Sequence, residues 1–382
     1  MSHPTRAIIH LDRLGRNLRL LGELTGGRPL WPCIKANAYG HGAEIVARHL
    51  VALGHDTLCV AHATEALELR EAGIRARLVL LSAALPEASD AVAEHGLEPV
   101  VCTHATLESL SRAAERVGRQ VAVHLKVDTG MGRVGVRPDE VEGFLERGRQ
   151  LPGVRVRGLM SHFPRADEAD KSFSRAQIES FHRVCEATRA AGIEVRHLAN
   201  SAGILDLPES HFDAARPGIA IYGLAPSKNI ANPRVAELEP VLEWRTRITF
   251  LKEVPTGTGL SYGHTFHTQR PSLVATLPVG YGDGLHRGLS NRMHVLVRGV
   301  RCPQVGTITM DQTLVDVTAL RGEIELGDEV VLIGRQGDEI ASADVLAQAL
   351  GTVHYEVVTA IARRVTRLAA ADENGASGSR PG

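Results

Sequence analysis

The sequence is poor in cysteine, has almost no net charge and lacks a long apolar run. The five cysteines are scattered without a C-x-x-C spacing, which favours buried, reduced thiols. No apolar run approaches transmembrane length, and residues 1–12 lack the apolar core of a secretory signal. A net charge of −1 gives no indication of binding to nucleic acid or to an anionic membrane. We therefore expect a cytoplasmic protein with neither kind of partner.

Three common catalytic or cofactor motifs are also missing. None of the 18 histidines forms H-x-H or H-E-x-x-H, so no metal site is predicted. No G-x-S-x-G elbow supports a serine hydrolase. Gly130-x-Gly132-x-x-Gly135 matches the dinucleotide fingerprint in form, but Pro138 interrupts before any helix, and no acidic residue follows at the required distance. We reject a Rossmann interpretation.

Apolar runs alternate with amphipathic helical patterns between residues 31 and 222. The helical patterns include Ala43–Leu53, Thr64–Ala72, Ala105–Val117 and Arg175–Ala190. Eight runs are typical of strands: Trp31–Ile34, Leu58–Ala61, Leu78–Leu81, Glu98–Val101, Val121–Val127, Val154–Met160, Val195–Leu198 and Ile219–Tyr222. This alternation predicts an α/β fold, a (β/α)8 TIM-like barrel, with an open doubly wound sheet as the alternative.

The pattern changes after Gly223. One clear helix, Ala343–Leu350, follows among strand-like runs: Glu243–Val254, Leu273–Leu277, His294–Val297, Leu314–Val317 and Glu329–Ile333. We therefore predict a barrel over residues 1–235, a mostly β domain over 236–370 and a disordered tail over 371–382. Residues 1–12, with a strand near Ala7–Leu11, are a candidate strand of the second domain.

Lysine is scarce, since only five of the 43 basic residues are lysines. One of them, Lys35, ends the first apolar run and is followed by a glycine-containing loop. A lysine kept where arginine is the default cation indicates amine chemistry, with a Schiff base to a carbonyl cofactor as the obvious candidate. A structural lysine that extends to the surface is the alternative, and the local pattern does not decide between them.

Polar residues gather at the ends of the predicted strands, where a barrel forms its active site. They are Lys35 and Tyr39, Lys126 with Asp128–Arg133, Ser161-His162, Asn200-Ser201 and Arg216-Pro217-Gly218. Four of the five tyrosines lie in loop-like settings: Tyr39, Tyr262, Tyr281 and Tyr355. Such phenols can donate, accept or act as acid or base in a pocket.

The stretch Lys35-Ala36-Asn37-Ala38-Tyr39-Gly40-His41-Gly42 resembles the pyridoxal-phosphate (PLP) attachment motif of the bacterial alanine racemases, which are fold-type III PLP enzymes. Other stretches resemble the same family: Lys126–Arg133, Asn200-Ser201, Arg216–Ile219, Ser261–Gly263, Gly280–Gly284, Met310–Gln312 and Tyr355-Glu356. The matches run in order from about residue 7 to residue 367. The family's N-terminal barrel and C-terminal β domain agree with the pattern above.

The resemblance implies a role for each matching residue. Lys35 would hold PLP as an aldimine and exchange the α-proton on one face, while Tyr262 of the partner subunit would serve the opposite face. Arg216 would face the pyridine nitrogen, where fold-related decarboxylases place a carboxylate. The other residues expected to bind the cofactor, mainly its phosphate, are Tyr39, His162, Ser201, Gly218, Ile219 and Tyr355. The barrel would thus bind PLP, and the active sites would be shared in a homodimer.

The same resemblance implies a substrate site. Arg133 and the backbone of Met310 would bind the substrate carboxylate. The supporting residues would be Lys126, often carbamylated in the family, together with Asn200, Tyr281 and Asp311. Tyr281 and Tyr355 would narrow the entrance and favour a small side chain. Pro164-Arg165 and Thr309 depart from the family pattern next to His162 and Met310.

We therefore expect an alanine racemase, an isomerase that interconverts L- and D-alanine by two-base proton transfer and supplies D-alanine for peptidoglycan of the cell wall. A racemase with broader specificity, for example for serine, is one alternative. A non-catalytic PLP-binding protein is another, although such barrels lack a second domain and a counterpart of Tyr262.

Overall fold

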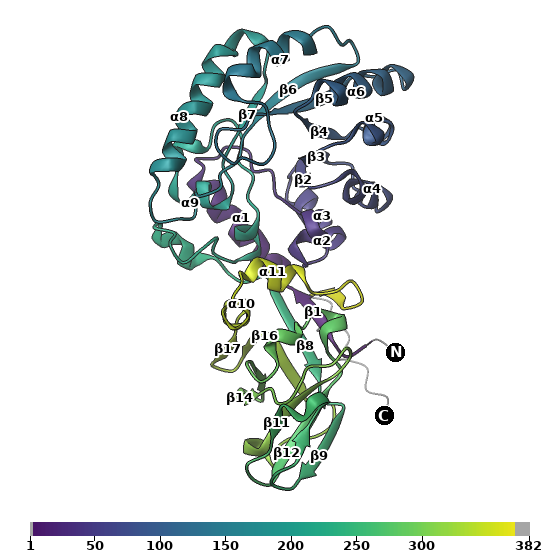
Figure 1. Cartoon of the computed structure of the whole chain (residues 1–382), viewed down its shortest axis with the longest axis vertical. Helices are drawn as coiled ribbons and strands as arrows, with labels where there is room; N and C mark the ends of the chain where they lie inside the picture. The colour runs from purple at the N-terminus through teal and green to yellow at the C-terminus, as the bar shows by residue number, and fades with distance from the viewer. Residues whose placement is uncertain (1–2, 371–382) are drawn as a thin grey trace. The chain divides into compact units, whose positions relative to one another are not determined.

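The computed structural model describes residues 3–370, and the chain within it divides into two compact units (Figure 1). Residues 12–38 and 43–240 form the first, here called the barrel unit. Residues 3–11, 39–42 and 241–370 form the second, here called the β unit. The domain limits proposed from the sequence stay a prediction, and the tail 371–382 lies outside the described residues. Within residues 3–370 no helix combines the length and apolar character needed to cross a bilayer.

Six parallel strands form the sheet of the barrel unit, in chain order from β2 to β7. They are β2 (Thr57–Val60), β3 (Arg77–Ala83), β4 (Glu98–Val101), β5 (Val121–Lys126), β6 (Val154–Met160) and β7 (Val195–His197). Parallel neighbours in chain order require a crossover after each strand, and helices supply these crossovers. The predicted α/β class, with strands and helices in alternation, is confirmed.

Two irregular segments close the ring between β7 and β2. Leu30 and Ala215 form a parallel bridge, Cys33 bridges to Cys59 of β2, and Ala214 bridges to His197 of β7. Backbone hydrogen bonds accompany these bridges, including Trp31 N–H to the Ala215 carbonyl (2.8 Å). The first and eighth positions of the barrel are therefore occupied by single bridges rather than by ladders.

The predicted eighth strand, Ile219–Tyr222, is wrong. This segment is a 3-10 helix, η5, and the eighth position of the ring belongs to residues just before Pro217. All four residues of η5 are buried. Hydrophobicity alone cannot separate a short buried strand from a short buried helical turn, which explains the error.

The helices of the barrel unit are α1 (Leu11–Leu24), α2 (Lys35–Tyr39), α3 (Ala43–Ala52), α4 (Ala63–Glu71), α5 (Ser89–His95), α6 (His104–Arg116), α7 (Val141–Gly148), α8 (Ser172–Ala187) and α9 (Ser201–Asp206). Within this set, the predicted helical patterns are observed as α1, α3, α4, α6 and α8. In α1 the buried leucines Leu14, Leu18 and Leu21 recur at helical spacing and form one apolar face.

The β unit contains a larger sheet in the order β14-β13-β16-β8-β1-β18, with β17 added to β16, and a smaller sheet β15-β12-β9. The strands of the larger sheet are β1 (Arg6–Ile9), β8 (Leu242–Arg247), β13 (His294–Val297), β14 (Val300–Pro303), β16 (Glu329–Gln336), β17 (Glu339–Ala341) and β18 (Thr366–Ala369). The remaining strands are β9 (Phe250–Val254), β12 (Ser272–Leu277), β15 (Thr313–Asp316) and the hairpin β10 (Gly259–Leu260) with β11 (Phe266–His267).

Three details of the β unit differ from or extend the sequence pattern. The run Glu243–Val254, predicted as one element, is split into β8 and β9, which belong to different sheets. Besides the predicted helix α10 (Ala343–Leu350), a second helix, α11 (His354–Thr359), follows. The N-terminal strand β1 runs between β8 and β18, antiparallel to the first and parallel to the second.

Two glycines with nearly the same backbone conformation test how tightly the barrel unit is packed. Gly223 (φ +77°) and Gly27 (φ +78°) are both left-handed, but a Cβ on Gly223 would lie 1.8 Å from the Glu239 carbonyl oxygen, whereas nothing lies within 4 Å at Gly27. We expect Gly27→Ala to lower the free energy of unfolding by about 1 kcal/mol, and Gly223→Ala by about 2–4 kcal/mol because a clash is added to the strain. Urea unfolding followed by circular dichroism measures both; equal losses would contradict the packing argument.

Candidate active site

The site lysine begins a left-handed turn. Lys35 is half-buried at the first position of α2, and the residues after it have φ between 52° and 55°: Ala36, Asn37 and Ala38. Such a conformation costs roughly 1–2 kcal/mol for each non-glycine residue. Hydrogen bonds hold it: the Ala36 N–H donates to Glu65 Oε1 (2.6 Å), and Asn37 Oδ1 accepts from the Ala43 N–H (2.8 Å). Strain held in this way is typical of a functional site.

Arg216 is the buried cation of the barrel unit, with 2% of its surface exposed. Its Nη2 donates to the carbonyls of Ser161 (2.8 Å) and Leu198 (3.1 Å), and its Nη1 donates to Nδ1 of His197 (2.6 Å). Nδ1 of His162 lies 3.4 Å from Nη2. Burial lowers the pKa of Arg216, and its hydrogen-bond partners here are neutral. The guanidinium can therefore offer charge and donors to a group at the mouth of the barrel.

Ser201 organises a group of backbone amides at the start of α9. Its Oγ accepts from the N–H groups of Gly218 (2.9 Å) and Ala220 (3.2 Å), and Ile219 lies between these two. Asn200 caps α9 through a hydrogen bond that its Oδ1 accepts from the Gly203 N–H (3.0 Å). Converging backbone donors beside a helix N-terminus are suited to an anion such as a phosphate.

Lys126, at the end of β5, is a buried amine, 4% exposed. Burial, together with the positive charges of Arg216 and Arg133, holds the pKa of Lys126 well below its usual value. Burial and the charge of Lys126 likewise hold the pKa of His162 well below its usual value. This side of the barrel is electropositive, so protonating these two groups is unfavourable. Among residues 3–370, no three His, Cys, Asp or Glu side chains are grouped to hold a metal ion.

In the β unit, Tyr262 is presented to solvent on a strained loop. The side chain is 74% exposed and begins the 3-10 turn η7 (Tyr262–His264). The preceding Ser261 has φ +60°, and its Oγ donates to the Thr307 carbonyl (2.6 Å). Thr307 Oγ1 in turn donates to the Tyr262 carbonyl (2.8 Å). The loop therefore fixes the backbone of a phenol that remains open to an external partner.

A second pair of loops in the β unit carries Tyr281 and Met310, which are 43% and 54% exposed. Arg364 links the loops: its Nε donates to Asp283 Oδ1 (2.7 Å) and its Nη2 donates to Asp311 Oδ1 (2.8 Å). The same Nη2 lies 3.4 Å from the Met310 carbonyl. Arg364 thus fixes the spacing between the two loops.

Tyr39 and Tyr355 also belong to the β unit, with ring centroids 6.3 Å apart. The segment that contains Tyr39 is attached through Gly40, whose carbonyl accepts from Nε (3.0 Å) and Nη2 (2.9 Å) of Arg367. A Cβ at Gly40 would lie 1.9 Å from the Val358 carbonyl oxygen, so only glycine fits. Four residues of the lysine motif are therefore built into the β unit.

The structure brings His162 to Arg216, and Gly218 to Ser201, in the barrel unit. In the β unit it pairs Tyr39 with Tyr355 and links Met310 and Asp311 to Arg364, whereas Tyr262 lies on a separate loop. Sequence reasoning missed several residues that hold them: Glu65, His197, Asp283, Thr307 and Arg364. His197 ends β7, one residue before the end of the predicted run Val195–Leu198, and could have been included by the strand-end rule. Asp283 lies inside the Gly280–Gly284 motif, which was a signal, whereas the other three carry no local signal.

A closed barrel with a lysine at its mouth, a buried arginine and converging backbone amides is an arrangement typical of barrel enzymes that bind an anionic ligand. Family models described as "Alanine racemase, N-terminal domain" and "Alanine racemase, C-terminal domain" match residues 9–226 and 241–369. The alanine racemase of Halothermothrix orenii is 44% identical over 370 residues, 96% of this chain and 97% of that protein.

Solved structures agree with the sequence relatives. The alanine racemase of Clostridium difficile 630 superposes with a TM-score of 0.91 at 34% identity, covering 96% of each chain. The enzyme of Bacillus anthracis with bound L-Ala-P gives 0.90 at 35% identity, covering 96% of this chain and 95% of that one. The chain belongs to the alanine racemase family, and the resemblance drawn from its motifs is confirmed.

Arg364 provides a test of the loop pair. Arg364→Ala removes both carboxylate contacts, so we expect amide hydrogen exchange in residues 280–284 and 309–312 to accelerate about three- to tenfold. Global stability falls by about 1–3 kcal/mol, because the buried carboxylate of Asp283 loses this partner. Arg335→Ala, an exposed arginine of β16, is the control and leaves these peptides unchanged. Exchange that is the same in all three proteins would remove Arg364 from this role.

Proposed function

We propose that this protein is a PLP-dependent alanine racemase, which interconverts L- and D-alanine and supplies D-alanine for peptidoglycan. The observation that carries the proposal is the match of both family domains along nearly the whole chain, in a barrel unit that has a lysine at its mouth and a buried arginine. On the basis of the same family match, we also propose that the enzyme is cytoplasmic.

The residues of the barrel unit fit PLP by the chemistry of their donors. The backbone N–H groups around Ser201 and Gly218 can donate hydrogen bonds to a phosphate, and Arg216 can donate to the pyridine nitrogen. Because arginine stays protonated, it would keep that nitrogen unprotonated. Further contacts are proposed for Lys35, Tyr39, His162, Ile219 and Tyr355. PLP, when bound, supplies the electron withdrawal that acidifies the α-carbon of an amino acid.

Inversion at a carbon requires a base on each face. We assign Lys35 to one face and Tyr262 of the partner subunit to the other, in a homodimer with shared active sites. The exposure of Tyr262 on a fixed loop supports this assignment, since such a phenol is available to a second chain. Each base takes the α-proton on its own face or returns one there, so the direction of transfer sets the product.

Arg133 and the backbone of Met310 are proposed to hold the substrate carboxylate, with Lys126, Asn200 and Asp311 in support. Tyr281 and Tyr355 would restrict the side chain to a small one. A broader amino-acid racemase would share every catalytic residue and differ only in this restriction. A non-catalytic PLP-binding protein would have no use for a β unit that carries Tyr262.

The two base assignments predict different losses. Tyr262→Phe removes one proton carrier but no proposed cofactor ligand, so we expect racemisation of alanine to fall by about 10²–10⁴-fold while the absorbance of bound PLP is retained. Lys35→Ala, in contrast, removes both activity and the absorbance of lysine-bound PLP. Chiral chromatography and absorbance spectra measure these outcomes. Full activity of Tyr262→Phe would exclude Tyr262 as a base.

Substrate range is tested by comparing L-alanine and L-serine with the purified protein and added PLP. Rapid formation of D-alanine with little D-serine is expected from the narrowing tyrosines. Comparable rates would support the broader racemase. If neither D-isomer forms although the protein absorbs as a PLP complex, the binding protein becomes the better assignment.

A further inference from the structure

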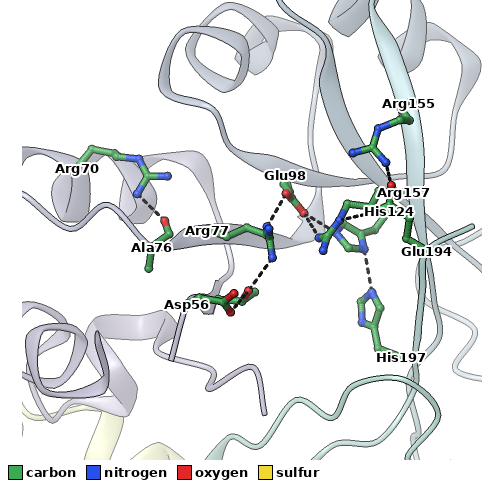
Figure 2. A network of polar contacts seen from close by, with 11 residues as sticks. Asp56, Arg70, Ala76, Arg77, Glu98, His124, Arg155, Arg157, Glu194 and His197 are labelled. Atoms are coloured by element: carbon green, nitrogen blue, oxygen red, sulfur yellow. Dashed lines mark hydrogen bonds and ion pairs between the residues drawn. The ribbon is translucent and has the colours of Figure 1, made fainter. Parts of the chain in front are cut away.

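A line of buried polar side chains runs from Arg216 through the barrel unit to its opposite end. Nη1 of Arg216 lies 2.6 Å from Nδ1 of His197, Nε2 of His197 lies 2.9 Å from Nδ1 of His124, and Nε2 of His124 lies 3.0 Å from Oε2 of Glu98. Figure 2 shows the part from His197 to Glu98. We call these four residues the relay. Its two ends are at opposite ends of the strands, because Glu98 is the first residue of β4.

The relay can carry its protons in only one order. A guanidinium only donates, so Nδ1 of His197 must accept, and the proton of a neutral His197 must then be on Nε2. Nδ1 of His124 accepts the hydrogen bond from Nε2–H of His197, so the proton of a neutral His124 is on Nε2. This Nε2–H donates a hydrogen bond to Glu98. A positive charge on either imidazole would set two donors against each other. The geometry therefore requires two neutral histidines, both protonated on Nε2.

The charges along the line agree with this order. Burial holds the pKa of His197 well below its usual value and also lowers that of His124, which favours the neutral form of both rings. Burial alone would raise the pKa of Glu98, but the hydrogen bond from His124 and the charges of Arg157 and Arg77 outweigh it and lower the pKa. Glu98 is therefore an anion, and the relay links it to Arg216.

Neighbouring residues pack closely against the side chains of the relay. The ring of Trp31 packs against both histidines. Its centroid lies 4.9 Å from that of His197 and 5.8 Å from that of His124. A Cβ on Gly158 would lie 2.2 Å from Nδ1 of His124, the atom that accepts from His197. The pairing of β5 with β6 shifts register between Val123 and His124, which brings Gly158 opposite His124. A register shift and an obligatory glycine at one contact indicate that the contact is required.

Glu98 is held in turn by two arginines, with Arg157 Nη1 at 2.8 Å and Arg77 Nε at 2.9 Å (Figure 2). Its side chain is 13% exposed, at the edge of a cleft of about 530 Å³. None of the residues that contact it is one of the proposed PLP or substrate ligands. A role of Glu98 in the reaction must therefore act through His124 and His197.

We propose that Glu98 is a positioning residue for the reaction: it fixes the tautomers of His124 and His197 and, through them, holds the Arg216 guanidinium in place. This inference rests on the proposed function, in which Arg216 faces PLP. Removing the carboxylate leaves the far end of the relay without its anion, so the rings can change tautomer and Arg216 loses a fixed acceptor.

Glu194 provides a matched control, because it also pairs with Arg157 (Nε to Oε2, 3.0 Å) but does not touch the relay. The experiment compares the PLP-loaded wild-type protein with Glu98→Gln and Glu194→Gln. Nitrogen-15 NMR of labelled histidines reports the tautomers, and steady-state kinetics reports kcat and KM for alanine. Circular dichroism confirms that each variant is folded.

In the wild type, both histidines are expected to be neutral with the proton on Nε2. Glu98→Gln changes the ring signals of His124 and His197 and lowers kcat about tenfold with KM unchanged, as for outer partners of metal-bound histidines. It also moves the pH at which the absorbance of bound PLP titrates, because a negative charge has been removed. Glu194→Gln changes none of these.

Two results would overturn the proposal: a proton on Nδ1 of either histidine in the wild-type protein, which needs no variant, or ring signals and kcat in Glu98→Gln that match those of Glu194→Gln. The tautomers are measured independently of turnover. A protein with the expected ring signals but no racemisation of any amino acid would overturn the proposed function and leave the order of the relay intact.

Discussion

A buried guanidinium without a carboxylate partner is the constraint on which the barrel unit depends. Placing a full charge in a protein interior costs several kcal/mol unless hydrogen bonds compensate. Arg216 is compensated by two carbonyls and by the lone pair of His197, so the strand ends that supply them cannot shift independently. Its field also disfavours charge on Lys126 and His162. One cation thus sets the protonation of its neighbours.

The β unit holds exposed groups in fixed positions. Exposed side chains are ordinarily mobile, but the backbones of Tyr262 and of the Met310 loop are each tied by side-chain hydrogen bonds from Thr307 and Arg364. These ties are made by neutral hydroxyls and by an arginine with two carboxylates. The order is local and does not require a large core behind each loop.

Much of the fold could be read from the sequence because alternating strands and helices leave a strong periodic signal. The prediction from sequence failed at Ile219–Tyr222, where the periodic signal is ambiguous, and at α11, where the element is short. The candidate residues of the barrel unit were proposed from the sequence because their loops lie at strand ends, and their roles stay a prediction. The relay was not proposed from the sequence, because His197 is 73 residues from His124 and His124 is 26 residues from Glu98, and no local pattern connects them.

The segment Tyr39–Gly42 has a consequence for how such proteins can be recombined. It leaves the barrel unit for four residues, is fastened to Arg367 and packed against Val358, and then returns. The N-terminal strand β1 likewise belongs to the β unit. A cut at residue 240 would therefore not yield two self-contained modules. A chimera that exchanges the C-terminal half with that of a relative has to carry over matching partners for Gly40 and for β1, or both halves lose contacts.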